Sequence, residues 1–181
     1  TVAASPTKLF VGQGFIGATC DGEPTTLGRE GSDYSAAVAA FILDAESVTI
    51  WKDVIGILNA DPKLFADATH VPEMTYLDAI ELAYSGAQII HPKTIKPLQN
   101  KNIPLYVRPF GDKFKPGSIV KGEMDHKIEI PILIVKHNQV LLSIRPHDFS
   151  FVLEDRLASI FSLLEKYNAK INMVQSSAVN L

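Results

Sequence analysis

Between residues 33 and 107, short β-branched runs alternate with stretches whose apolar side chains recur every three or four residues. The short runs predict buried strands, and the longer stretches predict helices. The predicted helices are 33–42, 76–84 and 91–99, and the predicted strands are 47–51, 87–90 and 103–107. Strands that alternate with helices at this spacing indicate an α/β sandwich with a mostly parallel sheet.

Polar residues at the ends of these stretches predict where the helices begin. We expect Ser32 or Asp33 to cap the first helix and Thr75 to cap the second, because both positions carry a side-chain oxygen directly before the apolar period. His91 precedes Pro92, so we interpret it as a helix-start residue and not as an acid or base. Trp51, in an apolar strand, is expected in the core.

A second unit is predicted after residue 120. Residues 110–123 lack a sustained apolar period and are interpreted as a linker. Beyond them, two apolar runs predict a hairpin at 128–135 and 140–144, followed by a helix near 153–167 and a strand at 171–174. This ββαβ order resembles the start of an ACT domain, a small ligand sensor, and gives domains at 1–120 and 121–181.

Composition narrows the class of protein. Of the 181 residues, 46% are hydrophobic and 20% are charged, which is typical of a folded globular protein. A net charge of -3 offers no basic field for nucleic acid, and no run of 18 apolar residues suggests a membrane span. One cysteine excludes an internal disulfide, so we expect a reducing, cytoplasmic setting.

The residues with the clearest chemistry lie in the loop before the first helix. Gly28 and Gly31 flank Arg29, and a helix is predicted to begin directly afterwards. Glycines let backbone N–H groups approach an anion, a helix start offers unpaired donors, and a guanidinium fits a carboxylate. The loop therefore predicts a site for a small anionic molecule. The alternative, a plain glycine-rich turn with a surface arginine, explains the same residues equally well.

Longer motifs resemble the aspartokinase family. These motifs are GFIG at residues 14–17, TTLGREGSDYSAA at 25–37, IWKDVIGILNADPK at 50–63 and GAQIIHPKTIKPL at 86–98. They occur in the family's order and spacing. The resemblance runs from about Val11 to Pro109 and continues more weakly through the ACT-like unit.

The resemblance implies an enzyme that transfers the γ-phosphoryl group of ATP, with Mg²⁺, to the β-carboxylate of L-aspartate. This reaction is the first step towards lysine, threonine and methionine. Asp33 would be catalytic, organising the cations around the transferred group. The implied aspartate site consists of Phe15, Arg29, Glu30, Gly31 and Ser32, and the implied ATP site consists of Lys52, Asp53, Leu58, Lys63, Gln88 and Ile89.

Some positions depart from the family pattern. Glu30 replaces a glycine, Lys52 a threonine, Leu58 a tyrosine and Lys63 an arginine. Gln88 replaces a lysine, which removes a positive charge expected near the phosphates. Our hypothesis is that Lys52 partly substitutes for that charge.

The resemblance also predicts what the chain lacks. The family's Lys-Phe-Gly-Gly-Thr-Ser loop has no counterpart here, so we expect a fragment without the phosphate-binding N-terminal lobe, inactive by itself. In the ACT-like unit, an amino-acid effector would contact Glu154, Asp155, Asn172 and Ser177, and a homodimer through ACT domains is implied. Two alternatives stay open: another kinase of this fold acting on glutamate or a nucleotide, and an inactive amino-acid-sensing module.

Overall fold

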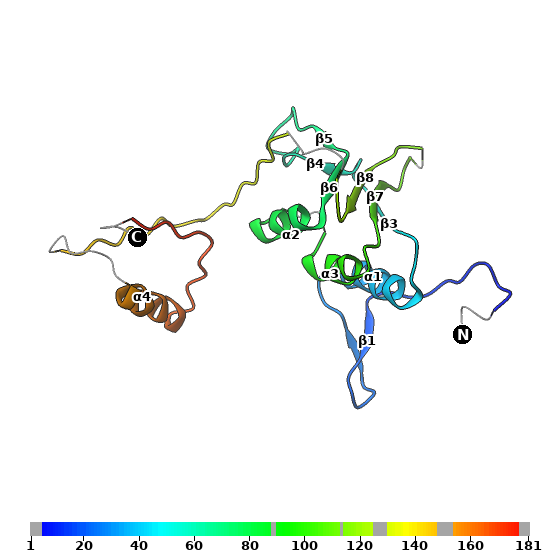
Figure 1. Cartoon of the computed structure of the whole chain (residues 1–181), viewed down its shortest axis with the longest axis horizontal. Coiled ribbons are helices and arrows are strands. Elements are labelled where there is room, and N and C mark those ends of the chain that lie inside the picture. The colour runs from blue at the N-terminus through cyan, green and yellow to red at the C-terminus, as the bar shows by residue number, and fades with distance from the viewer. Residues whose placement is uncertain (1–4, 88–89, 113, 125–129, 148–153, 178–181) are drawn as a thin grey trace. The chain divides into compact units, whose positions relative to one another are not determined.

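The structure, a computed structural model, describes residues 5–87, 90–112, 114–124, 130–147 and 154–177 (Figure 1). The chain forms two compact units, Thr1–Val135 and Lys136–Leu181. Residues 121–124 and 130–135 therefore lie with the first unit. The predicted division of domains at residue 120 stays a prediction.

The first unit is built on a four-stranded sheet. Its order is β3 (Val48–Lys52), β7 (Leu105–Pro109), β8 (Ser118–Lys121) and β6 (Glu73–Thr75). β3 pairs with β7 and β6 pairs with β8 in parallel, while β7 and β8 are antiparallel. This arrangement confirms the predicted α/β fold with a mostly parallel sheet.

Three helices pack together against one face of this sheet: α1 (Gly31–Leu43), α3 (Pro92–Asn100) and α2 (Tyr76–Ser85) (Figure 1). Alternate residues of the strands face the helices and are buried, as their period of two requires. The core they share includes Ala37, Ala40, Val48, Ile50, Met74, Ile95, Leu98, Leu105, Val107 and Val120. Trp51 points away from this core and is 45% exposed, so its predicted burial is wrong.

The predicted caps hold for two helices and fail for the third. Thr75 and Asp78 form a reciprocal capping box at the start of α2. At α3, the His91 side chain accepts a hydrogen bond from the Lys93 backbone N–H, which confirms its helix-start role. At α1, however, the cap position is Glu30, in the left-handed region with φ 53°, and Ser32 and Asp33 already belong to the first turn.

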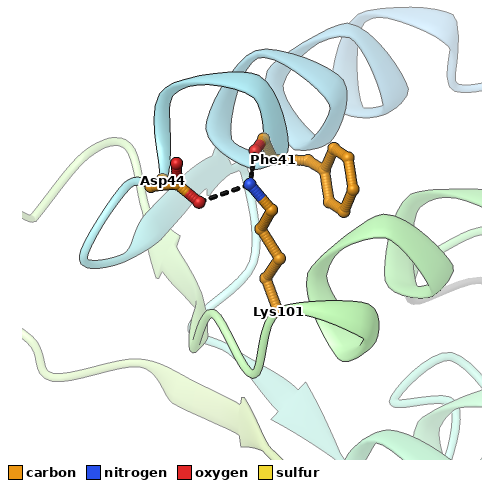
Figure 2. Close-up of polar contacts among 3 residues, drawn as sticks. All are labelled: Phe41, Asp44 and Lys101. Atoms are coloured by element: carbon orange, nitrogen blue, oxygen red, sulfur yellow. Dashed lines mark hydrogen bonds and ion pairs between the residues drawn. The ribbon is translucent and has the colours of Figure 1, made fainter.

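A lysine joins the C-terminal ends of α1 and α3. Lys101, directly after α3, donates from Nζ to the Phe41 carbonyl oxygen at 2.6 Å and pairs with the Asp44 carboxylate (Figure 2). Asp44 is the C-cap of α1. A cation there satisfies terminal carbonyl groups and complements the negative end of the helix dipole.

The predicted linker at 110–123 is partly wrong, because Ser118–Lys121 forms strand β8 inside the sheet. Four residues are too few for a sustained apolar period, although Val120 is fully buried. Ser118 is also buried. Its hydroxyl accepts from the Ile57 N–H at 2.8 Å and donates to the Val71 carbonyl at 2.6 Å. It thereby joins the main sheet to the small sheet of β4 (Ile57–Leu58) and β5 (His70–Val71).

A further hairpin pairs β1 (Ile16–Ala18) with β2 (Pro24–Thr26) ahead of α1. Residues 8–15, before this hairpin, carry no strand in the structure. Farther along the chain, residues 131–133 lie beside the start of the loop that connects β4 to β5. There the Leu133 N–H donates to the Asn59 carbonyl at 2.7 Å, and Asn59 Nδ2 donates to the Pro131 carbonyl at 3.1 Å.

In the second unit, the predicted helix is confirmed as α4 (Glu154–Lys166). The predicted hairpin is wrong within the described residues, since 130–147 contain no strand, and the strand predicted at 171–174 is also absent. Alternation predicts an apolar face, but a ladder forms only where a second backbone and a surface to cover are present. Val140 and Leu141 are 90% and 95% exposed, so no such surface buries them here.

Candidate functional site at the carboxyl edge of β3 and β7

Parallel strands β3 and β7 end side by side, with Lys52 opposite Pro109 in the register. A short loop connects α1 to β3, and another connects α3 to β7. Each helix therefore runs back along its strand and begins at the edge where the strands end. Two helix starts and two strand ends therefore gather at this edge, which is the usual place for ligands in open α/β sheets.

An ion pair lies at the centre of this edge. Lys52 Nζ, from the last residue of β3, is 3.0 Å from Asp33 Oδ2, in the first turn of α1. The two side chains are 23% and 17% exposed, so solvent reaches both but screens the pair incompletely. The carboxylate orients the ammonium group. It leaves two of the ammonium's three donors for another anion.

The loop containing Phe15 packs against the start of α1. The Phe15 N–H donates to Ser35 Oγ at 3.0 Å, and its carbonyl accepts from the Leu27 N–H at 2.8 Å. At Gly31, a Cβ atom would lie 2.9 Å from both the Phe15 ring and the Leu27 side chain. Only glycine fits at this point, because the three segments meet there.

Three of the predicted substrate residues are open to solvent, and one of them is Phe15, which is 45% exposed. Arg29 and Ser32 are both exposed, on either side of Gly31. Gly28 takes a left-handed conformation, with φ 71°, and its carbonyl accepts from the Gly31 N–H at 2.9 Å. The tight turn thus holds the segment that carries Arg29 next to the first turn of α1.

Glu30 faces a different partner. Its Oε2 accepts a hydrogen bond of 2.6 Å from the His91 N–H, at the start of α3. From the same turn of α3, Lys93 Nζ donates to the Leu27 carbonyl at 2.7 Å and lies 5.8 Å from the centre of the Tyr34 ring. Lys93 was missed by the sequence reasoning, because a lysine after His-Pro carries no signal of its partner.

The predicted nucleotide residues are less closely gathered. Asp53 follows β3 and is exposed, and Leu58 in β4 is partly buried. Lys63 is exposed in a turn in which its N–H donates to Asp61 Oδ1 at 2.9 Å. Gln88 and Ile89 lie outside the described residues. Among the residues that are described, neither Asp53 nor Lys63 has a hydrogen bond or ion pair with Asp33 or Lys52.

A hollow of about 380 Å³ lies beside this turn. It is lined by Asn59, Ala60, Leu64, Phe65, Ala66, Asp67, Ala68 and Leu133.

The predicted effector residues lie in the second unit. Asn172 Oδ1 accepts from Lys136 Nζ at 3.1 Å, and Asn172 Nδ2 donates to Gln139 Oε1 at 2.6 Å. The amide of Asn172 therefore bonds to the 136–139 segment. Glu154 and Asp155 are the first two residues of α4, and Ser177 lies at an isolated bridge.

Neither a metal cage nor a membrane helix is found in the described part of the chain. His, Cys, Asp and Glu side chains there do not gather in groups of three or more that would hold a metal ion. Across the same residues, every helix is too short or too polar to serve as a bilayer span.

Comparison with known proteins agrees with this arrangement. The model of the Amino acid kinase family matches residues 4–109. The lysine-sensitive aspartokinase 3 of Escherichia coli is 35% identical over 175 residues, which cover 96% of this chain and 38% of that protein. A bifunctional aspartokinase/homoserine dehydrogenase of Haemophilus influenzae is 44% identical over 117 residues, covering 65% of this chain and 14% of that protein.

Solved structures give the same result. The crystal structure of E. coli aspartokinase III in complex with aspartate and ADP matches with a TM-score of 0.72 and 35% identity, over 93% of this chain and 37% of that one. The chain thus spans well under half the length of these relatives. The family model covers more than half of the chain, including the glycine loop, Asp33 and Lys52, and the chain belongs to the amino acid kinase family.

Proposed function

We propose that this chain is the nucleotide-side part of an aspartate kinase, which transfers the γ-phosphoryl group of ATP to the β-carboxylate of L-aspartate. The observation that carries the proposal is the ion pair between Asp33 and Lys52 at the carboxyl edge of β3. Phosphoryl transfer needs reactants in line and cations around the transferred group, and little covalent chemistry from the protein.

In this proposal, Lys52 neutralises phosphate charge and Asp33 holds its ammonium group in place. Arg29 and Ser32, both exposed beside Gly31, receive the carboxylates of aspartate. Phe15 lines the same loop and limits the length of the acceptor. The short side chain of aspartate, and not the longer one of glutamate, is the acceptor that we assign.

ATP is expected beside the 57–63 segment, with Asp53, Leu58 and Lys63 as contacts and with Gln88 and Ile89 completing the site. Mg²⁺ with ATP shields the charge of the phosphates during transfer. It keeps several waters and is commonly bound through nucleotide phosphates and one or two carboxylates. Asp53 is the exposed carboxylate nearest in sequence to Lys52, which makes it the residue we assign to the hydrated ion.

The assignment of aspartate is supported by the names of the similar proteins, which are aspartokinases. One solved relative is in complex with lysine and aspartate. We assign an amino-acid effector to the second unit, near α4 and Asn172, and a homodimer through that unit. The single cysteine fits the reducing, cytoplasmic setting of such an enzyme.

The test is trapping of the acyl phosphate with hydroxylamine, using this chain and the gene's full-length product. Aspartate, glutamate and a nucleoside monophosphate are offered as acceptors with Mg²⁺ and ATP. We expect the hydroxamate only with aspartate. Reaction with glutamate or with the nucleotide instead assigns another activity of the family. If neither protein phosphorylates an acceptor and an amino acid still binds, the chain is a sensing module.

A further inference from the structure

We propose that Glu30 and Lys93 are positioning residues that clasp the substrate loop, residues 27–32, onto the first turn of α3. Neither side chain contacts the substrate in this proposal. Both act through the loop by fixing where Arg29 and Ser32 stand. The inference rests on the proposed function, because it assigns this loop to the amino-acid substrate.

The clasp consists of two side-chain hydrogen bonds, one reaching from the loop to α3 and one reaching from α3 to the loop. The Glu30 carboxylate reaches from the loop to the His91 N–H at 2.6 Å, and Lys93 Nζ reaches from α3 to the Leu27 carbonyl at 2.7 Å. The bonds lie three residues apart along the loop and two apart along α3. Two anchors at this separation stop the loop from rotating about either one.

The charge of the Glu30 carboxylate must be accommodated within the substrate loop. A carboxylate in a loop that receives an anionic substrate repels that substrate unless its charge is neutralised. The Glu30 carboxylate accepts from a backbone N–H at the start of α3, where the helix dipole favours negative charge. The negative charge is thereby held on α3, and Arg29 faces solvent without a carboxylate partner among the described residues.

The backbone makes the proposal testable. Glu30 has φ 53°, a left-handed conformation that glycine adopts at little cost and that other residues adopt rarely. Glu30→Gly therefore removes the carboxylate and relieves the backbone at the same time. A loss of loop order in this variant cannot be attributed to a strained backbone.

The first experiment measures hydrogen–deuterium exchange of the peptide that covers residues 27–34, in the full chain without ligand. We expect exchange to rise at least about fivefold in Glu30→Gly and in Lys93→Met, as a charge-assisted hydrogen bond predicts. Glu30→Gln keeps an acceptor oxygen and should fall between parent and glycine variant. Glu46→Gly, at an exposed position before β3, is the matched control. This measurement does not depend on catalysis, so it separates failure of the clasp from failure of the proposed function.

The second experiment measures steady-state kinetics in the gene's full-length product. We expect Glu30→Gly to raise KM for aspartate about tenfold and to leave KM for ATP within about twofold of the parent value, since the clasp positions only the amino-acid loop. Unchanged exchange in the 27–34 peptide overturns the proposal. So does a loss of thermal stability with unchanged KM for aspartate, because that result assigns the clasp a structural role only.

Discussion

Lys52 Nζ and Asp33 Oδ2 lie 3.0 Å apart, which joins the last residue of a buried strand to the first turn of a helix that precedes it in the chain. The pair forms because α1 runs antiparallel to β3 and starts where β3 ends. A cation held there by one carboxylate can bind a second anion. In the proposed reaction, that anion is a phosphate of ATP.

Replacing Lys52 should therefore weaken nucleotide binding. We expect Lys52→Thr to lower ATP affinity about tenfold, equal to about 1.4 kcal/mol, because one phosphate loses its cation. Lys52→Arg keeps the charge and should lose less. Isothermal titration with a non-hydrolysable ATP analogue measures the affinity. Lys96→Met, an exposed position on α3, is the control. Equal affinity in Lys52→Thr and the parent would contradict the assigned role.

The contacts that Lys101 makes with the end of α1 predict a change in stability without a change in function. Lys101→Met removes the bonds to the Phe41 carbonyl and the Asp44 carboxylate (Figure 2), and we expect a loss of about 1 kcal/mol in the free energy of unfolding. Urea denaturation measures this. Asp44→Gly should cost less, since Asp44 has φ 51° and glycine relieves that conformation. A larger loss in Asp44→Gly than in Lys101→Met would show that the carboxylate is the dominant partner.

Tyr76 predicts a pH dependence at high pH. Its hydroxyl donates to the Ile103 carbonyl at 2.6 Å, and burial raises the pKa of Tyr76 to about 12. In the unfolded chain the same group ionises near pH 10. Its contribution to stability is therefore complete below about pH 10 and is lost as the pH rises towards 12, by about 2 to 3 kcal/mol.

Comparison with Tyr76→Phe isolates this effect from other groups that titrate in the same range. The variant should be about 1 kcal/mol less stable at neutral pH, because the Ile103 carbonyl loses its donor. The difference between the two proteins should then shrink and reverse between pH 10 and 12. A constant difference across that range would contradict the raised pKa.

The sequence predicts the elements that are long and periodic. Helices α1, α2 and α3 and strands β3 and β7 are found close to where their patterns lie. Strand β8 was missed, because four residues carry too little pattern and its burial depends on β6 and β7 on either side. Trp51 was placed in the core because its type favours burial, whereas its orientation is set by the pleat, which turns Ile50 inward and Trp51 outward.

The membership of the candidate site stays a prediction from the motifs, and the contacts between its side chains could not be predicted from the sequence. The motifs named Phe15, Arg29, Glu30, Ser32, Asp33 and Lys52, and the structure brings their backbone segments together at one edge. Which side chains bond to each other depends on distances between segments far apart in the chain. Lys93 gives no local signal, and the partner of Glu30 lies 61 residues away.

The most direct test of the central claim compares hydroxamate formation from aspartate by the gene's full-length product with that of its Asp33→Asn variant. Asparagine keeps the shape and removes the charge that orients Lys52. With far-UV circular dichroism unchanged, we expect the parent to form aspartyl hydroxamate and the variant to be slower by about a hundredfold, the usual effect of losing one organising group in an active site. Equal rates in the two proteins, or a folded parent that does not react with aspartate at all, would contradict the account.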